Sequence, residues 1–318
     1  MARRSTHPRR SRPPRRSGSK RVLALVSLGV LAFADVVLIG LALGMIGGGA
    51  DEGDTEARPA ASFTAEASSE PTETPEPMPP ATPVLRSLTV VDGQAAWRAE
   101  RGACDTQAVI EVTSDGGATW TATRPVTTEG HEVLWLWAQD ESYAQAAVSA
   151  GDDCEWTGIR TFTSGNFWQP SPDALKAATF IAPDGALITP SGATAPCDTP
   201  VDVAERSDAL AVLCADGTVH ESLNGAGWTQ SIVPGALAIT EAGNGYALAV
   251  QRREGCDGIT LVMLSADSLA SGGAPSDSGL CLIGAVDAAA TALASSSDAV
   301  WLWSGSEHSV APLDTVLP

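Results

Sequence analysis

One element recurs five times in the C-terminal two-thirds of this chain: an apolar stretch, a polar turn, and a second stretch rich in alanine and aromatic residues. Sustained 3.6-residue periodicity is hard to find here, and short apolar runs bounded by turn residues are typical of β-hairpins. From about Leu85 onward the sequence therefore predicts an all-β domain. The copies are LTVVDGQAAW (88–97), VLWLWAQDESYAQAAV (133–148), VDVAERSDALAVLC (201–214), LAITEAGNGYALAV (237–250) and ATALASSSDAVWLW (290–303).

A second candidate hairpin follows the first in three of these copies. Two hairpins per repeat make the four-stranded blade of a β-propeller, and residues 85–318 at roughly 45 per blade give about five blades. The stretch 172–197 is an extra connection with a hairpin candidate at Pro183–Gly185. Whether the ring is complete stays open. The second hairpins are AVIEVTSDGGATWTAT, GIRTFTSGNFWQPS and GTVHESLNGAGWTQS.

The string TSDGGATW (113–120) resembles the Asp-box, or BNR repeat, whose pattern is Ser-x-Asp-x-Gly-x-Thr-Trp. Degraded copies of the pattern follow at Thr163–Trp168, which lacks the aspartate, and at Ser222–Trp228, which has asparagine in place of the aspartate and is one residue short. The resemblance implies a propeller-like fold in which the box is the turn of an outer hairpin, so we expect scaffold and not catalysis. The matching positions are Thr113, Asp115, Gly117, Thr119 and Trp120.

Asp-box enzymes include sialidases, and that resemblance would imply three arginines, a Tyr/Glu nucleophile pair and an acid/base aspartate. The Phe/Tyr-Arg-Ile-Pro motif of the first arginine is absent, and only two tyrosines occur. We therefore predict no catalytic residue. A working surface is expected on the side away from the box, at inner loops around Asp140–Tyr143, Glu205–Asp208 and Asn244–Tyr246. The candidate binding residues are Asp140, Glu141, Tyr143, Glu205, Asp208, Asn244 and Tyr246.

The N-terminal third predicts a membrane anchor. Val22–Ile46 holds 25 residues with one charge, Asp35, and about 20 apolar residues span a bilayer. Residues 1–21 carry nine Lys and Arg and no acid, which favours a disordered cytoplasmic tail and a C-terminal domain outside the cell. A cleaved signal peptide is the alternative, although its apolar core is usually only about 7–15 residues.

Residues 51–84 are rich in Pro, Glu, Thr and Ser and predict a disordered linker between the anchor and the domain at 85–318. Beyond residue 21 the chain has 10 basic and 38 acidic residues. Phosphate backbones are bound by positive charge, so this acidic body argues against a nucleic-acid partner. The partners expected are the membrane, through the helix, and an unidentified protein or glycan of the cell envelope.

All six cysteines follow the predicted anchor, and an even number outside the membrane is what an oxidising compartment allows. Six cysteines permit fifteen pairings. We favour sequential pairing, because Cys104 and Cys154 occupy equivalent places in neighbouring repeats, about 14–16 residues before each repeat's Trp. The predicted bridges are Cys104–Cys154, Cys197–Cys214 and Cys256–Cys281.

No cofactor or metal motif was found in the sequence. The histidines beyond the anchor are isolated, and the acidic loops at 140–141 and 152–155 lack the spaced oxygen ligands of a calcium site. The sequence thus favours a membrane-anchored binding module at the cell surface. There are two alternatives, a surface glycoside hydrolase and an assembly factor for envelope proteins. A pair of carboxylates at the central cleft would favour the hydrolase.

Overall fold

The computed structural model describes residues 86–104, 108–123, 132–151, 153–192, 194–251, 253–282 and 286–316. The chain divides into two units, Met1–Glu73 and Thr74–Pro318, and every described residue belongs to the second. The predicted tail (1–21), membrane helix (22–46) and linker (51–84) lie outside the described residues. Among the residues that are described, no helix has the length and apolar character needed to cross a membrane.

Five antiparallel sheets, here called blades 1 to 5, make up most of the domain, and each is built from one continuous stretch of chain. Blade 1 contains β1 (Arg86–Val90), β2 (Ala96–Glu100), β3 (Ile110–Thr113) and β4 (Thr121–Thr123). Blade 2 contains β5 (Val133–Ala138), β6 (Ala144–Ala150), β7 (Glu155–Thr161) and β8 (Trp168–Pro170). Blade 3 contains β11 (Pro200–Arg206), β12 (Ala209–Cys214), β13 (Thr218–Leu223) and β14 (Thr229–Ile232).

Blade 4 contains β15 (Ala236–Ala242), β16 (Gly245–Gln251), β17 (Ile259–Ser265) and β18 (Ser276–Leu282). Blade 5 has three strands, β19 (Thr291–Ser295), β20 (Ala299–Ser304) and β21 (Glu307–Pro312). A separate two-stranded hairpin, β9 (Phe180–Ile181) with β10 (Leu187–Ile188), lies between blades 2 and 3 in the chain. The short helices are α2 (Pro172–Ala177), α3 (Ala266–Ser271), η1 (Ala288–Ala290) and η2 (Leu313–Thr315).

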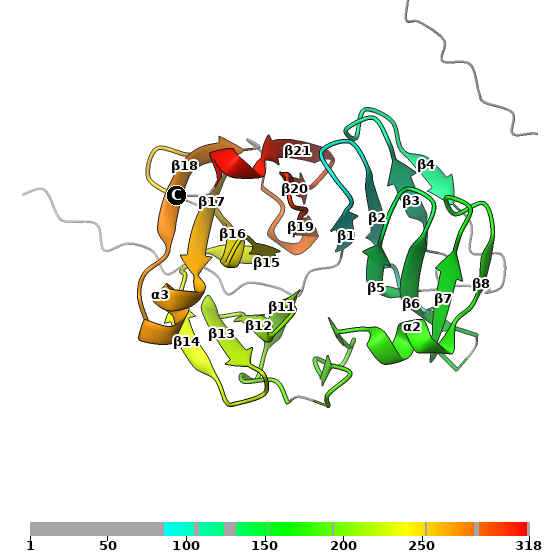
Figure 1. Ribbon diagram of the computed structural model, residues 1–318, viewed down its shortest axis with the longest axis horizontal. Helices are drawn as coiled ribbons and strands as arrows, with labels where there is room; N and C mark the ends of the chain where they lie inside the picture. The colour runs from blue at the N-terminus through cyan, green and yellow to red at the C-terminus, as the bar shows by residue number, and fades with distance from the viewer. Residues whose placement is uncertain are drawn as a thin grey trace, which may run out of the picture. The chain divides into compact units, whose positions relative to one another are not determined.

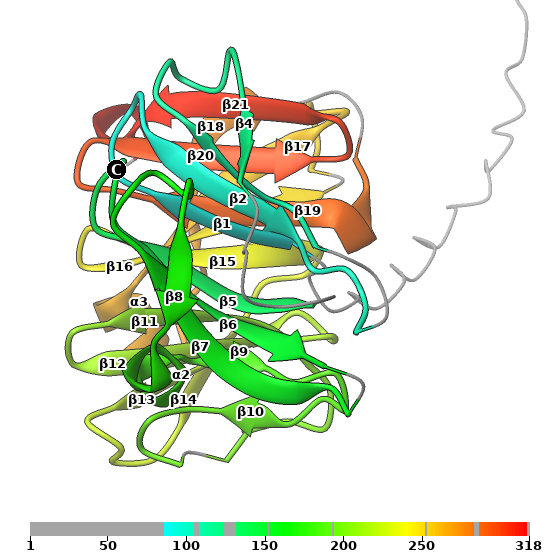
Figure 2. The ribbon, with the colours of Figure 1, turned by 90° about the vertical axis from the view of Figure 1, so that its right-hand side faces the viewer.

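The five blades form a closed ring. The first strand of each blade, β1, β5, β11, β15 or β19, faces the centre (Figure 1). Contacts join β1 to β5, β11 to β15, β15 to β19 and β19 to β1. The hairpin strand β9 contacts both β5 and β11 and fills the gap between blades 2 and 3, while β19 contacts β1 and completes the circle. Figure 2 shows the ring from the side, with the strands of neighbouring blades running roughly alongside one another.

This architecture confirms the predicted five-bladed, propeller-like fold. Each of the five recurring sequence elements is the inner hairpin of one blade, and the three second hairpins are the outer ones. The hairpin predicted at Pro183–Gly185 is the turn between β9 and β10. The sequence did not predict the helices α2 and α3, or that blade 5 has three strands among the described residues.

Alanine explains how closely the blades approach. The second strand of a blade is covered on both faces, and its alanines Ala96, Ala146, Ala211 and Ala247 are completely buried. A methyl group fills little space, so neighbouring sheets can approach one another closely. This is why the recurring element is rich in alanine after its turn.

The two ends of the ring carry different connections. Where a blade has both hairpins, their turns lie together at one end, here called the turn end. The backbone N–H of Gly116 donates to Gln94 O (2.9 Å), that of Ser164 to Ser142 O (3.1 Å) and that of Asn224 to Asp208 O (2.8 Å). Each bond joins the outer turn of a blade to the inner turn of the same blade.

The opposite end holds all three disulfides and is here called the disulfide end. The pairs are Cys104–Cys154, Cys197–Cys214 and Cys256–Cys281, which confirms the predicted pairing. Cys104 follows β2 and Cys154 precedes β7, so their bridge ties blade 1 to blade 2. The other two bridges close loops within 17 and 25 residues.

Side chains, not a shared strand, close the ring between blades 5 and 1. The Arg98 guanidinium lies 4.0 Å from the ring centre of Trp120 and 4.7 Å from that of Trp303. Arg86 lies 4.0 Å over Trp303 and donates to the carbonyl oxygens of Ala290 and Gly305. Trp301 Nε1 donates to Asp92 O at 3.0 Å. Cation–π stacking therefore joins the first and last blades.

Candidate functional site: the central tunnel

The Asp-box-like string forms the β3–β4 turn and is held by its own side chains. Asp115 accepts hydrogen bonds from the Thr119 N–H (2.9 Å), the Thr119 hydroxyl (2.6 Å) and the Thr113 hydroxyl (2.8 Å). These bonds, led by the Thr119 hydroxyl, lower the pKa of Asp115. Gly117 has a φ of +86°, and a Cβ there would lie 2.4 Å from His308 Nε2. Each of these hydrogen bonds lies within the turn and holds it in shape.

The β7–β8 turn repeats this arrangement with one substitution. The Gly165 N–H donates to the Thr161 hydroxyl, as the Gly117 N–H donates to that of Thr113, both at 3.1 Å. The Thr163 hydroxyl accepts from the Phe167 N–H at 2.9 Å and so takes the place of the Asp115 carboxylate. The segment whose hydrogen bonds match those of 113–120 is therefore 161–168, which starts two residues before the predicted Thr163–Trp168.

The tryptophans that end these two turns pack against the preceding blade in the same way. Trp120 meets Trp301 of blade 5 edge-on at 6.2 Å, and Trp168 meets Trp97 of blade 1 edge-on at 6.1 Å. The third copy, in the β13–β14 turn, lacks such a partner; Trp228 instead contacts His220 of its own blade. The two turns with matching hydrogen bonds thus belong to blades 1 and 2, and the tryptophan of each packs against the preceding blade.

The predicted position of the working surface is wrong in one respect. The loops at Asp140–Tyr143, Glu205–Asp208 and Asn244–Tyr246 are inner turns, and inner turns lie at the same end as the Asp-box-like turn. In an up-and-down blade, the first and third turns fall at one end because the strands alternate in direction. These loops therefore do not lie on the opposite side of the domain.

Several of the predicted loop residues hold the turns in shape. Asp140 accepts from Ser142 N and Oγ and from Tyr143 N, and these bonds, led by the Ser142 hydroxyl, lower its pKa. Glu141 is exposed in the same turn. The Asn244 carbonyl accepts from Arg206 Nη1 at 3.1 Å, which links blade 3 to blade 4.

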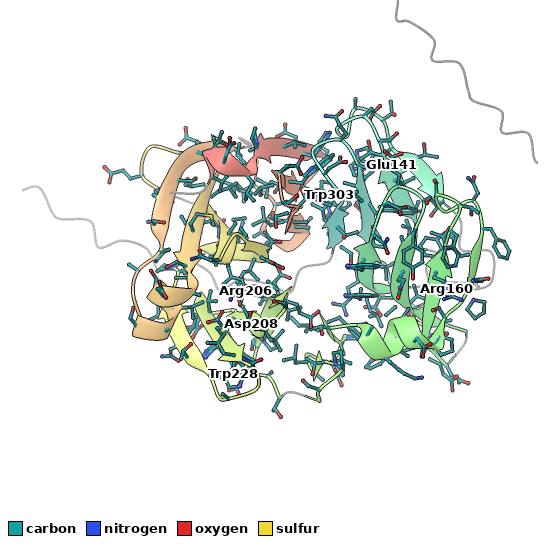
Figure 3. All side chains as sticks on the ribbon, in the orientation of Figure 1. Glu141, Arg160, Arg206, Asp208, Trp228 and Trp303 are labelled. Atoms are coloured by element: carbon teal, nitrogen blue, oxygen red, sulfur yellow. A yellow bond between two sulfur atoms is a disulfide. The ribbon has the colours of Figure 1, made fainter. Side chains whose placement is uncertain are left out.

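Arg206 and Asp208 lie side by side on blade 3 (Figure 3) and form an ion pair at 3.2 Å. Tyr246 is completely buried, contrary to its prediction as a binding-loop residue. Its hydroxyl donates to Glu221 Oε1 at 2.8 Å, and burial together with this carboxylate raises the pKa of Tyr246. It belongs to a buried contact between blades 3 and 4.

The most promising site is the tunnel at the centre of the ring, a cavity of about 900 Å³. Its wall is made by the five inner strands together with residues 179–181 at β9. Cavities of 300–1,000 Å³ are typical of ligand sites. The polar and aromatic side chains that line it include Trp135, Trp137, Asp202, Glu205, Thr240 and Glu241.

The two arginines of the tunnel wall are already engaged. Arg101, near the disulfide end, is buried and pairs with Glu132 at 2.6 Å, and it also donates to Ile181 O at 2.7 Å. Arg86 pairs with Glu100 and two carbonyls at the blade 5–blade 1 junction. Both guanidinium groups are thus held by other groups of the protein itself.

Asp202 is the most unusual group in the tunnel. It lies where the register of β11 shifts, and its two carboxylate oxygens accept from Val203 N (2.9 Å) and from Ile239 N of blade 4 (2.8 Å). The Asp202 side chain is half-buried. Among the described residues, no cationic side chain pairs with its carboxylate. Desolvation raises the pKa of Asp202 to about 7, against the effect of its two hydrogen bonds.

Two further carboxylates line the tunnel towards the turn end. Glu205 is exposed and accepts from the Thr179 hydroxyl at 2.6 Å. Glu241 is exposed at the end of β15, and partial desolvation raises its pKa. Trp137 of β5 lines the same cavity and is 40% exposed. The turn-end mouth therefore combines negative charge with an accessible aromatic ring.

The sequence located Glu205 but not the tunnel around it. Asp202, Glu241 and Trp137 belong to three strands that are up to 100 residues apart, and no short motif joins them. The available signal was the acidic residue within an otherwise largely apolar inner strand, as at Asp202 and Glu205 in β11 and Glu241 in β15. Among the described residues, no three His, Cys, Asp or Glu side chains gather in a way that would hold a metal ion.

Comparisons with known proteins identify no family. No protein-family description matches this sequence, and no curated protein matches it. Similar solved structures include YCF48 bound to D1 peptide, with 14% identity, 71% of this chain and 77% of that chain covered, and a TM-score of 0.40.

Two enzymes are also among the similar structures. The PQQ-bound aldose sugar dehydrogenase from Streptomyces coelicolor has 13% identity over 74% of this chain and 96% of its own, with a TM-score of 0.43. The arabinanase Arb43A from Bacillus subtilis has 11% identity over 73% and 95%, with a TM-score of 0.35. These neighbours are propeller-type proteins, and at this distance their activities do not transfer to this chain.

Proposed function

We propose that this protein is a membrane-anchored binding module of the cell surface, and that its ligand enters the central tunnel from the turn end. The observation that carries the proposal is the distribution of charge in the tunnel. The carboxylates of Glu205 and Glu241 face the cavity near the turn end, whereas Arg86 and Arg101 are bound to other groups. Such a site favours a neutral or cationic ligand over an anionic one.

The test compares two pairs of charge-neutral substitutions in the full chain, purified in a non-ionic detergent. E205Q/E241Q changes the tunnel mouth, and E155Q/E254Q changes two exposed glutamates near the disulfide end. Short peptides and oligosaccharides of positive, neutral and negative charge serve as probes, with tryptophan fluorescence as the readout. We expect binding of cationic or neutral probes, weakened only by E205Q/E241Q. Preferential binding of anionic probes would contradict the proposal.

The proposed location rests on the sequence of the N-terminal third, and the three disulfides fit an oxidising compartment. Protease added to intact cells should remove the β domain and leave the basic tail protected. Complete protection of both parts would place the domain inside the cell and overturn the location.

We also propose that Thr113–Trp120 is an Asp-box and 161–168 a degraded copy of it. The matching hydrogen bonds and tryptophan contacts of the two turns support this. Thr163→Asp tests it: an aspartate there should form the bonds that Asp115 makes and raise Tm, whereas a lower Tm would contradict the equivalence.

Glycoside hydrolysis is the second candidate function, and Asp202 is the observation that favours it. A carboxylic acid with a pKa near 7 in a cavity lined by further carboxylates has the properties of a general acid. Chromogenic aryl glycosides in both anomeric forms provide the assay. Turnover by the wild type that is lost in D202N would establish an enzyme; absence of turnover with all substrates would leave binding as the function.

A further inference from the structure

An exposed aromatic patch adjoins the tunnel mouth at the turn end. It consists of Trp137 on β5, Tyr143 in the β5–β6 turn, Phe162 after β7 and Phe167 in the β7–β8 turn. The Trp137 and Tyr143 ring centres are 6.0 Å apart, and those of Tyr143 and Phe162 are 4.8 Å apart. Trp137 is 40%, Phe162 55% and Phe167 54% exposed. Large exposed aromatic side chains gathered in this way mark an interaction site.

Elsewhere in this domain, arginines of the chain itself stack on aromatic rings that are buried or half-buried. Arg86 and Arg98 stack on Trp303 and Trp120, and Arg206 lies 5.6 Å over Tyr246. The patch itself already holds one guanidinium, because Arg160 of β7 (Figure 3) lies 5.2 Å over Phe162. Within the described part of the chain, Trp137 has no cation over its ring, although it is the patch residue that lines the tunnel.

The surrounding charge favours a cation from outside the chain. Residues 86–318 contain 29 acidic and 9 basic residues. Glu205 and Glu241 line the same tunnel as Trp137, and Glu141 is exposed in the turn that carries Tyr143. A negative surface attracts cationic partners and raises their association rate.

We propose that Trp137 receives an arginine side chain from a partner polypeptide at the tunnel mouth. A guanidinium is planar, stacks on an aromatic face and donates to carboxylates in a fork geometry, so an arginine-containing segment suits both the indole ring and the carboxylates of the same cavity. The partner is thus a protein segment that carries arginine in an otherwise uncharged or basic stretch. This inference rests on the proposed function and names its ligand class.

The test uses the full chain in a non-ionic detergent and four fluorescent probes. Three are peptides: a nonapeptide with three arginines spaced by Gly and Ser, the same peptide with lysines, and the same peptide with glutamates. The fourth is a neutral oligosaccharide. Variants are W137L and, as a matched control, W156L. Trp156 is 39% exposed, close to the value for Trp137, but it contacts Phe180 and lies at the start of β7 near the disulfide end.

We expect the arginine peptide to bind more tightly than the lysine peptide, and the glutamate peptide not to bind. W137L should weaken arginine-peptide binding by about threefold to thirtyfold, the range for a cation–π contact at a partly exposed site, and W156L should not. Circular dichroism melts of both variants check that the fold is retained. E205Q/E241Q keeps the indole ring but removes two negative charges. It should therefore weaken binding of the arginine peptide and reduce the dependence of that binding on salt concentration.

Three results would overturn the inference. Equal arginine-peptide binding by wild type, W137L and W156L would mean that general acidity attracts the peptide. Binding of a neutral oligosaccharide, but of no peptide, with loss in W137L and in E205Q/E241Q, would replace the arginine by a sugar and leave the proposed function intact. If no probe responds to E205Q/E241Q or to W137L, both the inference and the proposed function fail.

Discussion

The two ends of the ring are stabilised in different ways: one end is held by covalent bridges, and the other leaves several side chains accessible to solvent. The disulfide end carries three covalent bridges and the buried Arg101–Glu132 pair. The turn end is held by short hydrogen bonds between side chains and turns, such as those of Asp115 and Asp140, and it leaves Trp137, Glu205 and Glu241 accessible. We infer that the braced end fixes the ring so that the other end can present exposed groups.

The largest difference between the ends should appear when an ion pair is broken. Glu132→Ala leaves Arg101 buried without its carboxylate, and removing one partner of a buried pair costs about 3–5 kcal/mol of unfolding free energy. Asp208→Ala removes the exposed partner of Arg206 at the turn end, which should cost less than about 1 kcal/mol. Urea unfolding of both variants measures the contrast, and equal losses would contradict it.

The bridge between blades 1 and 2 should be the next largest contributor. Removing Cys104–Cys154 in C104S/C154S frees a loop of 50 residues and should cost about 2–4 kcal/mol. C197S/C214S opens a loop of 17 residues within one region of the ring and should cost less. If the shorter bridge proved the more important, the tie between blades would not be what stabilises this end.

A smaller effect is expected from the best-preserved turn at the other end. Gly117→Ala should destabilise by about 1–3 kcal/mol, because it forces a positive φ on alanine and places a methyl group against His308. Gly185→Ala is the control, since it has a similar φ of +84° and open space around its Cβ. The excess loss in G117A, read from Tm, reports the packing between blades 1 and 5.

The smallest expected effect is a dependence on pH inside the tunnel. Because the pKa of Asp202 is raised to about 7, the folded state binds its proton more tightly than the unfolded state does. Its stabilising contribution is therefore complete below about pH 4 and is lost as the pH rises through 7. Unfolding free energies of wild type and D202N, measured from pH 4 to 8, should diverge by about 1 kcal/mol or more. Parallel curves would show that Asp202 titrates normally.

The hairpins were predictable because each one is encoded locally. Alternating apolar residues and a Gly, Asp or Asn turn specify a hairpin such as 237–250 without reference to the rest of the chain. The cysteine pairing was predictable for a related reason, since Cys104 and Cys154 occupy equivalent repeat positions. Tyr246 was misjudged because its burial depends on Glu221 of the neighbouring blade, which no local pattern shows.

The tunnel could not be predicted because it exists only after the ring closes. Its carboxylates come from β11 and β15 and its accessible indole from β5, so their proximity depends on blade order and on the inserted hairpin at β9. The position of Asp202 depends further on a register shift in β11, which the sequence VDVAER does not reveal.

Hydrogen–deuterium exchange with the arginine peptide maps binding onto the two ends of the ring without any mutation. We expect slower exchange in the inner turns at 138–144, 206–209 and 242–245 when the peptide is present, and no change in the segments around Cys104, Cys154 and Cys256. Protection that appears at the disulfide end instead would contradict the central claim that the turn end of the tunnel is the binding surface.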